Sequence, residues 1–262
     1  MTRLFAPAKL TLSLAVTGVR ADGYHQLRSE MVSLSLADEL TFTDGGTGLT
    51  LVAEPGTHAE SLGTDGDNLI TRALAAVGRR AAVHVRKRIP VGGGLGGGST
   101  DAATVLRWAR CTDLDVARAL GSDVPFSVAG GRALVEGTGE TVTPLDFAPR
   151  TFLLVLPPFG VDTAKVYAAW DERARRGERQ PPESEGNALT AAALAVEPRL
   201  ALWRDALGAV AGGEPTLAGS GSTWFIEVEA DGSGEDPSWL TLGDERARLI
   251  RAHTVPAGWN GS

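Results

Sequence analysis

The sequence predicts a mixed α+β fold, and three observations support this class. Segments with an apolar residue at every second position, which is typical of half-buried strands, gather near the N-terminus. Segments with apolar residues spaced three or four apart, which is typical of amphipathic helices, recur later in the chain. No internal repeat is evident. Strands and helices are therefore expected to be partly segregated along the chain.

Composition places the chain among ordinary globular proteins. It has 262 residues, of which 43% are hydrophobic and 22% are charged, so disorder, collagen-like repeats and a disulfide scaffold are not favoured. A chain of this length buries roughly 70–75% of the surface that its unfolded form exposes. That is enough for one large domain or two small ones.

The charge and cysteine content argue against several kinds of partner. A net charge of −7 disfavours broad capture of nucleic acid, which needs clustered Lys and Arg. No apolar run approaches the ~20 residues of a membrane span, and the first residues lack the apolar core of a signal peptide. The single cysteine, Cys111, has no Cys or His neighbours at zinc-ligand spacing, so no metal ligands are expected. We expect a cytoplasmic monomer or homodimer that binds neither nucleic acid nor membranes.

The first half of the chain contains strands followed by helices. Asp67 or Asn68 is placed to cap the first helix, and Gly78 to end it. The predicted elements are strands at 10–16, 31–36, 40–43 and 49–52, a helix at 69–77, a strand at 82–89, helices at 99–110 and 114–120, and a strand at 132–136.

The second half follows a predicted boundary within 143–149, which gives domains at 1–147 and 148–262. The charged, Pro-bearing segment 176–186 is interpreted as a solvated loop, and the Gly-, Asp- and Ser-rich stretch 230–239 fits no motif. The predicted elements are a strand at 151–156, helices at 164–175, 189–196 and 200–210, a strand at 223–229, a final helix at 244–251 and a short terminal strand.

A glycine-rich loop between a predicted strand and a predicted helix is the strongest functional signal. Glycine permits positive φ and lets an anion approach without a Cβ in the way, and the helix N-terminus adds free N–H groups. This pattern favours phosphate binding over a merely flexible loop. The hydroxyls of Ser99 and Thr100 could reach a phosphate oxygen or Mg²⁺. The candidate residues are Gly92, Gly93, Gly94, Leu95, Gly96, Gly97, Gly98, Ser99 and Thr100.

Two common phosphate-binding motifs fit this loop poorly. A Walker A motif needs Lys after its last glycine, whereas Gly98 is followed by Ser99. The spacing Gly92-x-Gly94-x-x-Gly97 matches the Rossmann fingerprint, but no parallel strand ending in an acidic residue follows. A Rossmann-type NAD(P) oxidoreductase therefore stays a weaker alternative.

The loop resembles the second motif of the GHMP small-molecule kinases, and two further motifs of that family occur in the expected order. These are Pro7-Ala8-Lys9-Leu10-Thr11-Leu12 and Leu217-Ala218-Gly219-Ser220-Gly221-Ser222-Thr223. The resemblance implies ATP and Mg²⁺ as cofactors and two domains with the active site in the cleft between them. The N-terminal domain would bind the nucleotide, and the C-terminal α/β domain would help to cover the substrate.

The element Asp22-Gly23-Tyr24-His25 and the segment Gly121-Ser122-Asp123-Val124-Pro125 resemble one branch of these kinases. That branch phosphorylates the 2-hydroxyl of a cytidine-diphosphate-linked methylerythritol in the non-mevalonate route to isoprenoid precursors. The resemblance implies Lys9 and Asp123 as the catalytic pair; Tyr24, His25, Thr163, Tyr167, Thr11, Gly219 and Ser220 as substrate-binding; and Asn68 and Lys87 near the adenine nucleotide. Thr11 stands where the family usually has Asn.

The chemistry of these residue types fits phosphoryl transfer. The acceptor oxygen must lie in line and lose its proton while charge on the γ-phosphoryl is stabilised. Asp123 can take the proton, and Lys9 can keep that carboxylate ionised and orient the hydroxyl. Two aromatic faces suit a flat cytosine, and His25 could bond its edge.

Several alternatives remain open from the sequence. Each candidate taken alone also fits a structural role: Lys9 as a solvated charge, Asp123 as a helix cap, Tyr24 and Tyr167 as packing aromatics. A GHMP kinase for another alcohol, such as homoserine or a mevalonate derivative, is the first alternative. A catalytically silent nucleotide-binding relative is disfavoured because both Lys9 and Asp123 are present.

Overall fold

Two β-sheets form the framework of the protein. The structure, a computed structural model, describes residues 1–59, 62–64, 67–178, 186–230 and 238–261. The strands are β1 (Thr2–Val19), β2 (His25–Asp44), β3 (Leu49–Ala53), β4 (Ala81–Lys87), β5 (Arg132–Gly137), β6 (Thr141–Leu145), β7 (Thr151–Leu156), β8 (Thr216–Leu217), β9 (Trp224–Val228), β10 (Trp239–Leu242) and β11 (Glu245–His253). The helices are α1 (Leu69–Ala76), α2 (Gly97–Ala109), α3 (Leu114–Leu120), α4 (Val124–Ala129), α5 (Thr163–Arg175), α6 (Thr190–Val196) and α7 (Leu200–Ala211). The predicted α+β class is confirmed.

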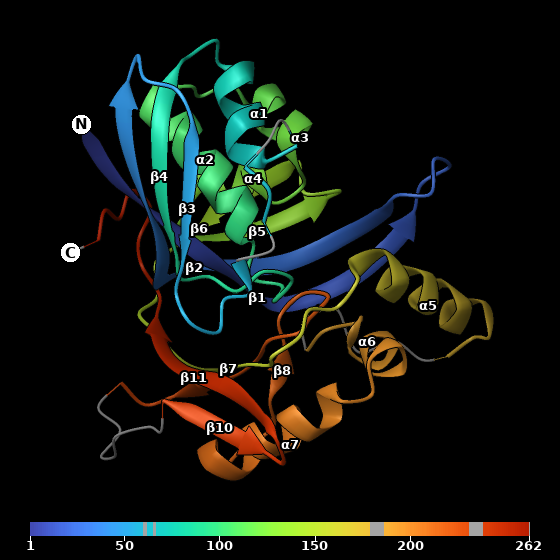
Figure 1. Ribbon diagram of the computed structural model, residues 1–262. Coiled ribbons are helices and arrows are strands. Elements are labelled where there is room, and N and C mark those ends of the chain that lie inside the picture. Colours follow the sequence, from blue (N-terminus) through green and yellow to red (C-terminus); the bar gives the residue numbers. More distant parts are fainter. Residues whose placement is uncertain (60–61, 65–66, 179–185, 231–237, 262) are drawn as a thin grey trace.

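The first sheet has the strand order β3-β4-β2-β5-β6, with β1 paired to β2, and helices α1 to α4 lie against it (Figure 1). The second sheet has the order β10-β11-β7-β9-β8 and packs against α7. The predicted boundary falls between β6 and β7, which belong to different sheets, and the division into domains stays a prediction. No helix within the described ranges is long and apolar enough to cross a membrane.

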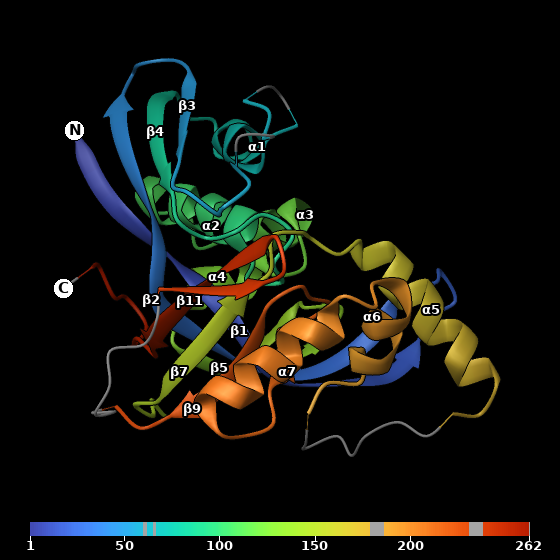
Figure 2. The same ribbon diagram turned by 60° about the horizontal axis from the view of Figure 1, so that its bottom comes forward.

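The β1–β2 hairpin extends beyond its own sheet and reaches the helices of the second half (Figures 1 and 2). The two strands predicted at 31–36 and 40–43 are one strand, because antiparallel pairing with β1 continues through the residues between them. Leu10 and Leu34 of the hairpin share a buried cluster with Phe152 and Phe225 of the second sheet. The hairpin therefore joins the two halves through a common core.

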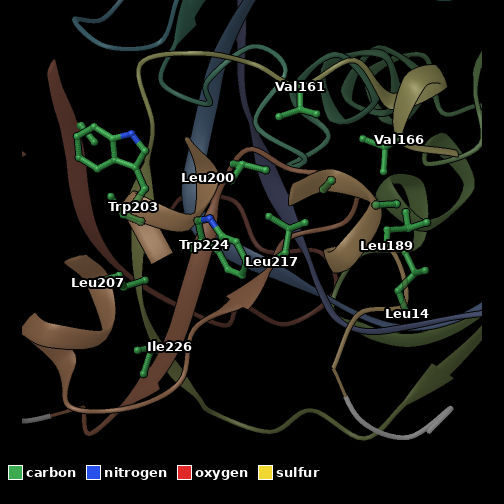
Figure 3. Packing of buried hydrophobic residues seen from close by; sticks show 14 of the residues in the cluster. Leu14, Val161, Val166, Leu189, Leu200, Trp203, Leu207, Leu217, Trp224 and Ile226 are labelled. Carbon is green, nitrogen blue, oxygen red and sulfur yellow. The ribbon is translucent and has the colours of Figure 1, made fainter. Parts of the chain in front are cut away.

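The core of the second half lies between its sheet and α5, α6 and α7. Figure 3 shows Trp203 and Leu207 of α7 beside Trp224 and Ile226 of β9. Leu14 of β1 belongs to the same buried cluster. Burial of these large apolar side chains is the main force that holds the helices on the sheet.

Two of the differences from the sequence prediction concern helices. The final helix predicted at 244–251 is wrong: this segment is strand β11, whose buried residues Ala247 and Leu249 alternate with exposed ones. Its Ala, Arg and Leu residues favour a helix locally, but pairing with β7 and β10 overrides that preference. Helix α4 was not predicted as a separate element, although Pro125 is well suited to the first turn of a helix. The segments 176–186 and 230–239 lie largely outside the described residues.

Candidate active site

The glycine-rich loop follows β4 and leads into α2. Gly92, Gly94 and Gly96 have φ values of 69°, 76° and 70°, a region that favours glycine. A Cβ on Gly94 would overlap the carbonyl oxygen of Ala218, and one on Gly96 would lie 2.7 Å from Cγ of Lys9. The glycines thus allow both the backbone shape and the close approach of neighbouring segments.

The second half of the protein holds this loop in place. Gly92 O accepts hydrogen bonds from the backbone N–H groups of Val161 (3.4 Å) and Ser222 (3.2 Å). Gly93 O accepts one from the N–H of Thr223 (3.2 Å). The second and third sequence motifs therefore meet directly, as parts of one structure.

A first cavity of about 490 Å³ lies over the loop. Residues Gly92 to Ser99 line it on one side, so every predicted loop residue except Thr100 faces this space. Leu51, Leu62 and Ile89 supply an apolar wall suited to a flat base. The N-terminus of α2 at Gly97 adds free N–H groups and a partial positive charge suited to phosphate.

Three other predicted nucleotide residues have structural bonds of their own. Asn68 lines the cavity and caps α1, because its Oδ1 accepts from the N–H of Ile70 at 3.0 Å. The buried hydroxyl of Thr100 donates to the carbonyl oxygen of Pro7 at 2.8 Å, away from the cavity. Lys87 lines the cavity, but its ammonium group is ion-paired and almost fully buried.

The partners of Lys87 are two buried aspartates that the sequence did not single out. Lys87 Nζ donates to Asp38 and, at 2.6 Å, to Asp101. Asp38 also accepts from the backbone N–H groups of Arg88 (2.5 Å) and Ile89 (2.9 Å), at the end of β4. Burial raises the pKa of Asp101 to about 8; Lys87 opposes that shift and Asp38 adds to it. Burial opposes the charge on Lys87, but both carboxylates raise its pKa above the usual value.

A second cavity of about 1090 Å³ holds the predicted catalytic pair. Lys9 Nζ lies 3.3 Å from Asp123 Oδ2 and 3.2 Å from the hydroxyl oxygen of Thr11. The side chain of Lys9 is 8% exposed and that of Asp123 is 29% exposed, so only the carboxylate is open to a ligand. Asp123 precedes α4 without capping it, which leaves its carboxylate available.

The third motif forms another wall of this second cavity. The hydroxyls of Thr163 and Ser220 are 2.7 Å apart, which joins the start of α5 to the glycine turn. A Cβ on Gly219 would lie 3.4 Å from Lys9 Nζ. Asn187 fixes the turn from behind, because its Nδ2 donates to the carbonyl oxygens of Leu217 (2.8 Å) and Gly219 (2.6 Å).

The predicted base-binding residues line the far end of the same cavity. Tyr24 is 68% exposed, and no ring contact joins it to Tyr167 among the described residues. His25 instead covers Tyr167, with ring centroids 4.6 Å apart. Burial and the charge of Asp123 raise the pKa of Tyr167, so its hydroxyl stays protonated. Asp171, which the sequence did not indicate, lies with Oδ1 at 2.7 Å from His25 Nε2, so its carboxylate can accept a hydrogen bond from that nitrogen.

The topology around the loop argues against a Rossmann-type unit. β4 pairs in parallel with β3 and antiparallel with β2. The next strand after α2, which is β5, pairs antiparallel with β2 and with β6. β4 and β5 are thus parallel to each other, but β2 lies between them. Within the described strands the loop and α2 therefore do not join two adjacent parallel strands, which the dinucleotide fingerprint requires.

Comparison with known proteins agrees with this geometry. The family model described as "GHMP kinases N terminal domain" matches residues 68–131, which include the loop and Asp123. The 4-diphosphocytidyl-2-C-methyl-D-erythritol kinase of Paracoccus denitrificans is 38% identical over 89% of this chain and 93% of its own length. The enzyme of that name from Salinispora tropica is 37% identical over 95% of this chain and 86% of its own.

Solved structures show the same relationship. A crystal structure of 4-(cytidine 5'-diphospho)-2C-methyl-D-erythritol kinase is 33% identical, covers 86% of this chain and 89% of its own, and has a TM-score of 0.66. A mevalonate kinase has a TM-score of 0.57 over 98% of this chain at 14% identity, which shows a shared fold alone. The chain belongs to the GHMP kinase family, and within it to the 4-diphosphocytidyl-2-C-methyl-D-erythritol kinases.

Proposed function

We propose that this protein transfers the γ-phosphoryl group of ATP to the 2-hydroxyl of 4-diphosphocytidyl-2-C-methyl-D-erythritol, on the non-mevalonate route to isoprenoid precursors. One observation carries the proposal: Gly94 and Gly96 line both cavities, and Lys9 and Asp123 lie in the second cavity beside them. A phosphate chain on the loop would end next to the pair that faces the acceptor alcohol.

Asp123 is the general base in this proposal. Its partly exposed carboxylate can accept the proton of the substrate hydroxyl, a role worth about 10²–10⁴-fold in rate. Lys9, 3.3 Å away, favours the ionised form of that carboxylate and adds positive charge where the γ-phosphoryl oxygens would lie. The hydroxyl oxygen of Thr11, 3.2 Å from Lys9 Nζ, is the second partner of the ammonium group.

ATP and Mg²⁺ fit the first cavity in different ways. The apolar wall suits adenine, and the loop N–H groups suit the phosphates. Within the described residues no group of three or more His, Cys, Asp or Glu side chains could hold a metal, so the ion would arrive with the nucleotide. Mg²⁺ in kinases takes few protein ligands besides phosphate oxygens, and Ser99 offers a hydroxyl at the cavity wall. When bound, Mg²⁺ neutralises charge on the phosphates.

The far end of the second cavity fits the cytidine part of the substrate. Tyr24, His25 and Tyr167 offer stacking surface and a ring nitrogen, and base stacking contributes about 1–3 kcal/mol. The hydroxyls of Thr163 and Ser220 line the same cavity, and Ser220 follows Gly219, which approaches Lys9 Nζ, so these hydroxyls could bind the diphosphate.

The test is ADP release from MgATP with four alcohols: 4-diphosphocytidyl-2-C-methyl-D-erythritol, homoserine, mevalonate and galactose. We expect turnover with the cytidine substrate alone, and ³¹P and ¹³C NMR should place the new phosphate on the 2-oxygen. Turnover with another alcohol and not with this one would overturn the substrate assignment while leaving the kinase fold and catalytic pair. Turnover with none would contradict the proposed reaction.

A further inference from the structure

Helix α5 holds the ring of His25 from three directions. Tyr167 covers one face of the ring at a centroid distance of 4.6 Å. Trp170 meets it edge-on at 5.5 Å, with an interplanar angle of 88°. Asp171 Oδ1 lies 2.7 Å from Nε2. These three side chains come from one helical turn, and α5 lies beside the outer end of the β1–β2 hairpin, where His25 begins β2 (Figures 1 and 2).

The two nitrogens of this ring have different surroundings. A carboxylate accepts hydrogen bonds, so its contact with Nε2 places a proton on that nitrogen. The other nitrogen, Nδ1, makes no hydrogen bond within the described part of the chain, and His25 lines the second cavity. A neutral ring held in this way presents the lone pair of Nδ1, which is a hydrogen-bond acceptor, to a ligand.

We propose that Asp171 is a positioning residue for base selection: it holds His25 with the proton on Nε2, so that Nδ1 accepts from the exocyclic amino group of cytosine. The proposal rests on the proposed function. Cytosine carries an amino donor at the position where uracil carries a carbonyl acceptor. An acceptor at Nδ1 therefore binds cytosine and faces an unpaired acceptor in uracil, which is penalised in a partly buried site.

The first experiment measures base preference in variants of α5. Asp171→Asn keeps the shape of the side chain, but its amide can donate to Nε2 and allow the proton to move to Nδ1. We expect KM for the cytidine substrate to rise about 10-fold while KM for ATP stays within about 2-fold. The preference for this substrate over its uridine analogue should fall by about the same factor, and Asp171→Glu should restore part of it. The matched control is Glu172→Gln, next to Asp171, whose partner is the exposed Arg176.

The second experiment reads the tautomer directly and needs no substrate. ¹⁵N-histidine labelling, with the signal of His25 assigned through His25→Gln, distinguishes a protonated from an unprotonated ring nitrogen. At pH 8 we expect the proton on Nε2 in the wild type and a population with the proton on Nδ1 in Asp171→Asn. A wild-type ring protonated on Nδ1, or on both nitrogens, would overturn the proposal.

The two experiments separate this proposal from the proposed function. A wild-type enzyme that does not phosphorylate the cytidine substrate contradicts the proposed function. A wild-type enzyme that does so, together with an unchanged base preference and KM in Asp171→Asn, overturns the role of Asp171 alone.

Discussion

Two lysine–aspartate clusters lie beside the glycine-rich loop, and they differ in accessibility and in the number of their carboxyl groups. Lys9 faces one carboxylate, Asp123, at 3.3 Å, and that carboxylate is 29% exposed in the larger cavity. Lys87 faces two carboxylates, Asp38 and Asp101, and all three side chains are at most 5% exposed. The first cluster is balanced and open, whereas the second is sealed and places two carboxyl groups beside one ammonium, with the pKa of Asp101 raised to about 8 by burial.

This difference separates a pair that can exchange protons with a ligand from one that holds the fold. A general base must reach its substrate and be able to change protonation state during turnover. Asp123 meets the first requirement because its carboxylate has no backbone partner in α4. Asp38 instead accepts two backbone N–H groups at the end of β4, so it fixes the strand that leads into the loop. Proximity to the nucleotide cavity alone therefore does not make a lysine catalytic.

Removal of the sealed cation should have the largest effect on stability. Lys87→Met leaves the carboxylate of Asp38 buried without its cation, beside the carboxyl group of Asp101, and we expect a loss of about 3–5 kcal/mol in the free energy of unfolding. Lys9→Met should cost about 1 kcal/mol or less, because Asp123 can be hydrated. Urea unfolding of both variants measures the contrast. Equal losses would show that the two clusters do not differ as described.

Loss of the open carboxylate should instead affect turnover. Asp123→Asn removes the proton acceptor, so we expect kcat to fall at least about 10²-fold while affinity for ATP and stability stay nearly unchanged. Steady-state ADP release and ATP binding by calorimetry measure the two quantities. Asp115→Asn, at an 85% exposed carboxylate on α3, is the matched control. Wild-type turnover in Asp123→Asn would remove Asp123 from the role of base.

A change in the loop itself should disturb the open cluster first. A methyl group on Gly96 meets Lys9 Cγ at 2.7 Å, and φ of 70° adds about 1–2 kcal/mol of strain. We therefore expect Gly96→Ala to lower both stability and kcat. Gly212→Ala is the control, because its φ is 75° and nothing lies within 4 Å of the added Cβ. In Gly212→Ala we expect a similar loss of stability with an unchanged kcat. Equal kcat values in Gly96→Ala and Gly212→Ala would show that Lys9 is not displaced.

The buried carboxyl group of Asp101 in the sealed cluster predicts a dependence of stability on pH. The pKa of Asp101 is about 8 in the folded state, whereas the ordinary value of an aspartate is 3.8. Between about pH 4 and pH 8 the folded protein therefore keeps a proton that the unfolded chain has released. The stability that this retained proton contributes is fully present below about pH 4 and is lost as the pH rises through 8. From pH 5 to 8 the wild type should lose stability relative to Asp101→Asn by at most about 1.4 kcal/mol per pH unit. Parallel curves from urea unfolding would contradict this assignment.

Local sequence patterns predicted most elements because those elements depend on neighbouring residues. The cap expected at Asp67 or Asn68 is Asn68, and the glycine-rich loop lies between a strand and a helix as predicted. Strand β11 could not be predicted in this way, because its conformation depends on pairing with β7, far away in the sequence. The same holds for the partners of Lys87: Asp38 lies on β2 and Asp101 on α2, and only the packed fold brings them together.

Within the site, the motifs identified Lys9 and Asp123, but the sequence alone left each with a structural alternative. The fold brings them to 3.3 Å. Asp171 carried one usable signal, since it follows Tyr167 by four residues and therefore lies on the same helix face. Its contact with His25 required knowledge that α5 packs against the β1–β2 hairpin, which no local pattern contains.

The backbone bonds that fix the glycine-rich loop have a consequence for the order in which the protein is made. Gly92 and Gly93 are synthesised long before Ser222 and Thr223, whose N–H groups complete the loop. A nascent chain that ends before Ser222 contains every glycine of the loop but lacks these two bonds to its backbone. With ATP bound at the loop as proposed, ATP present during synthesis is expected to stabilise the completed fold rather than its N-terminal half.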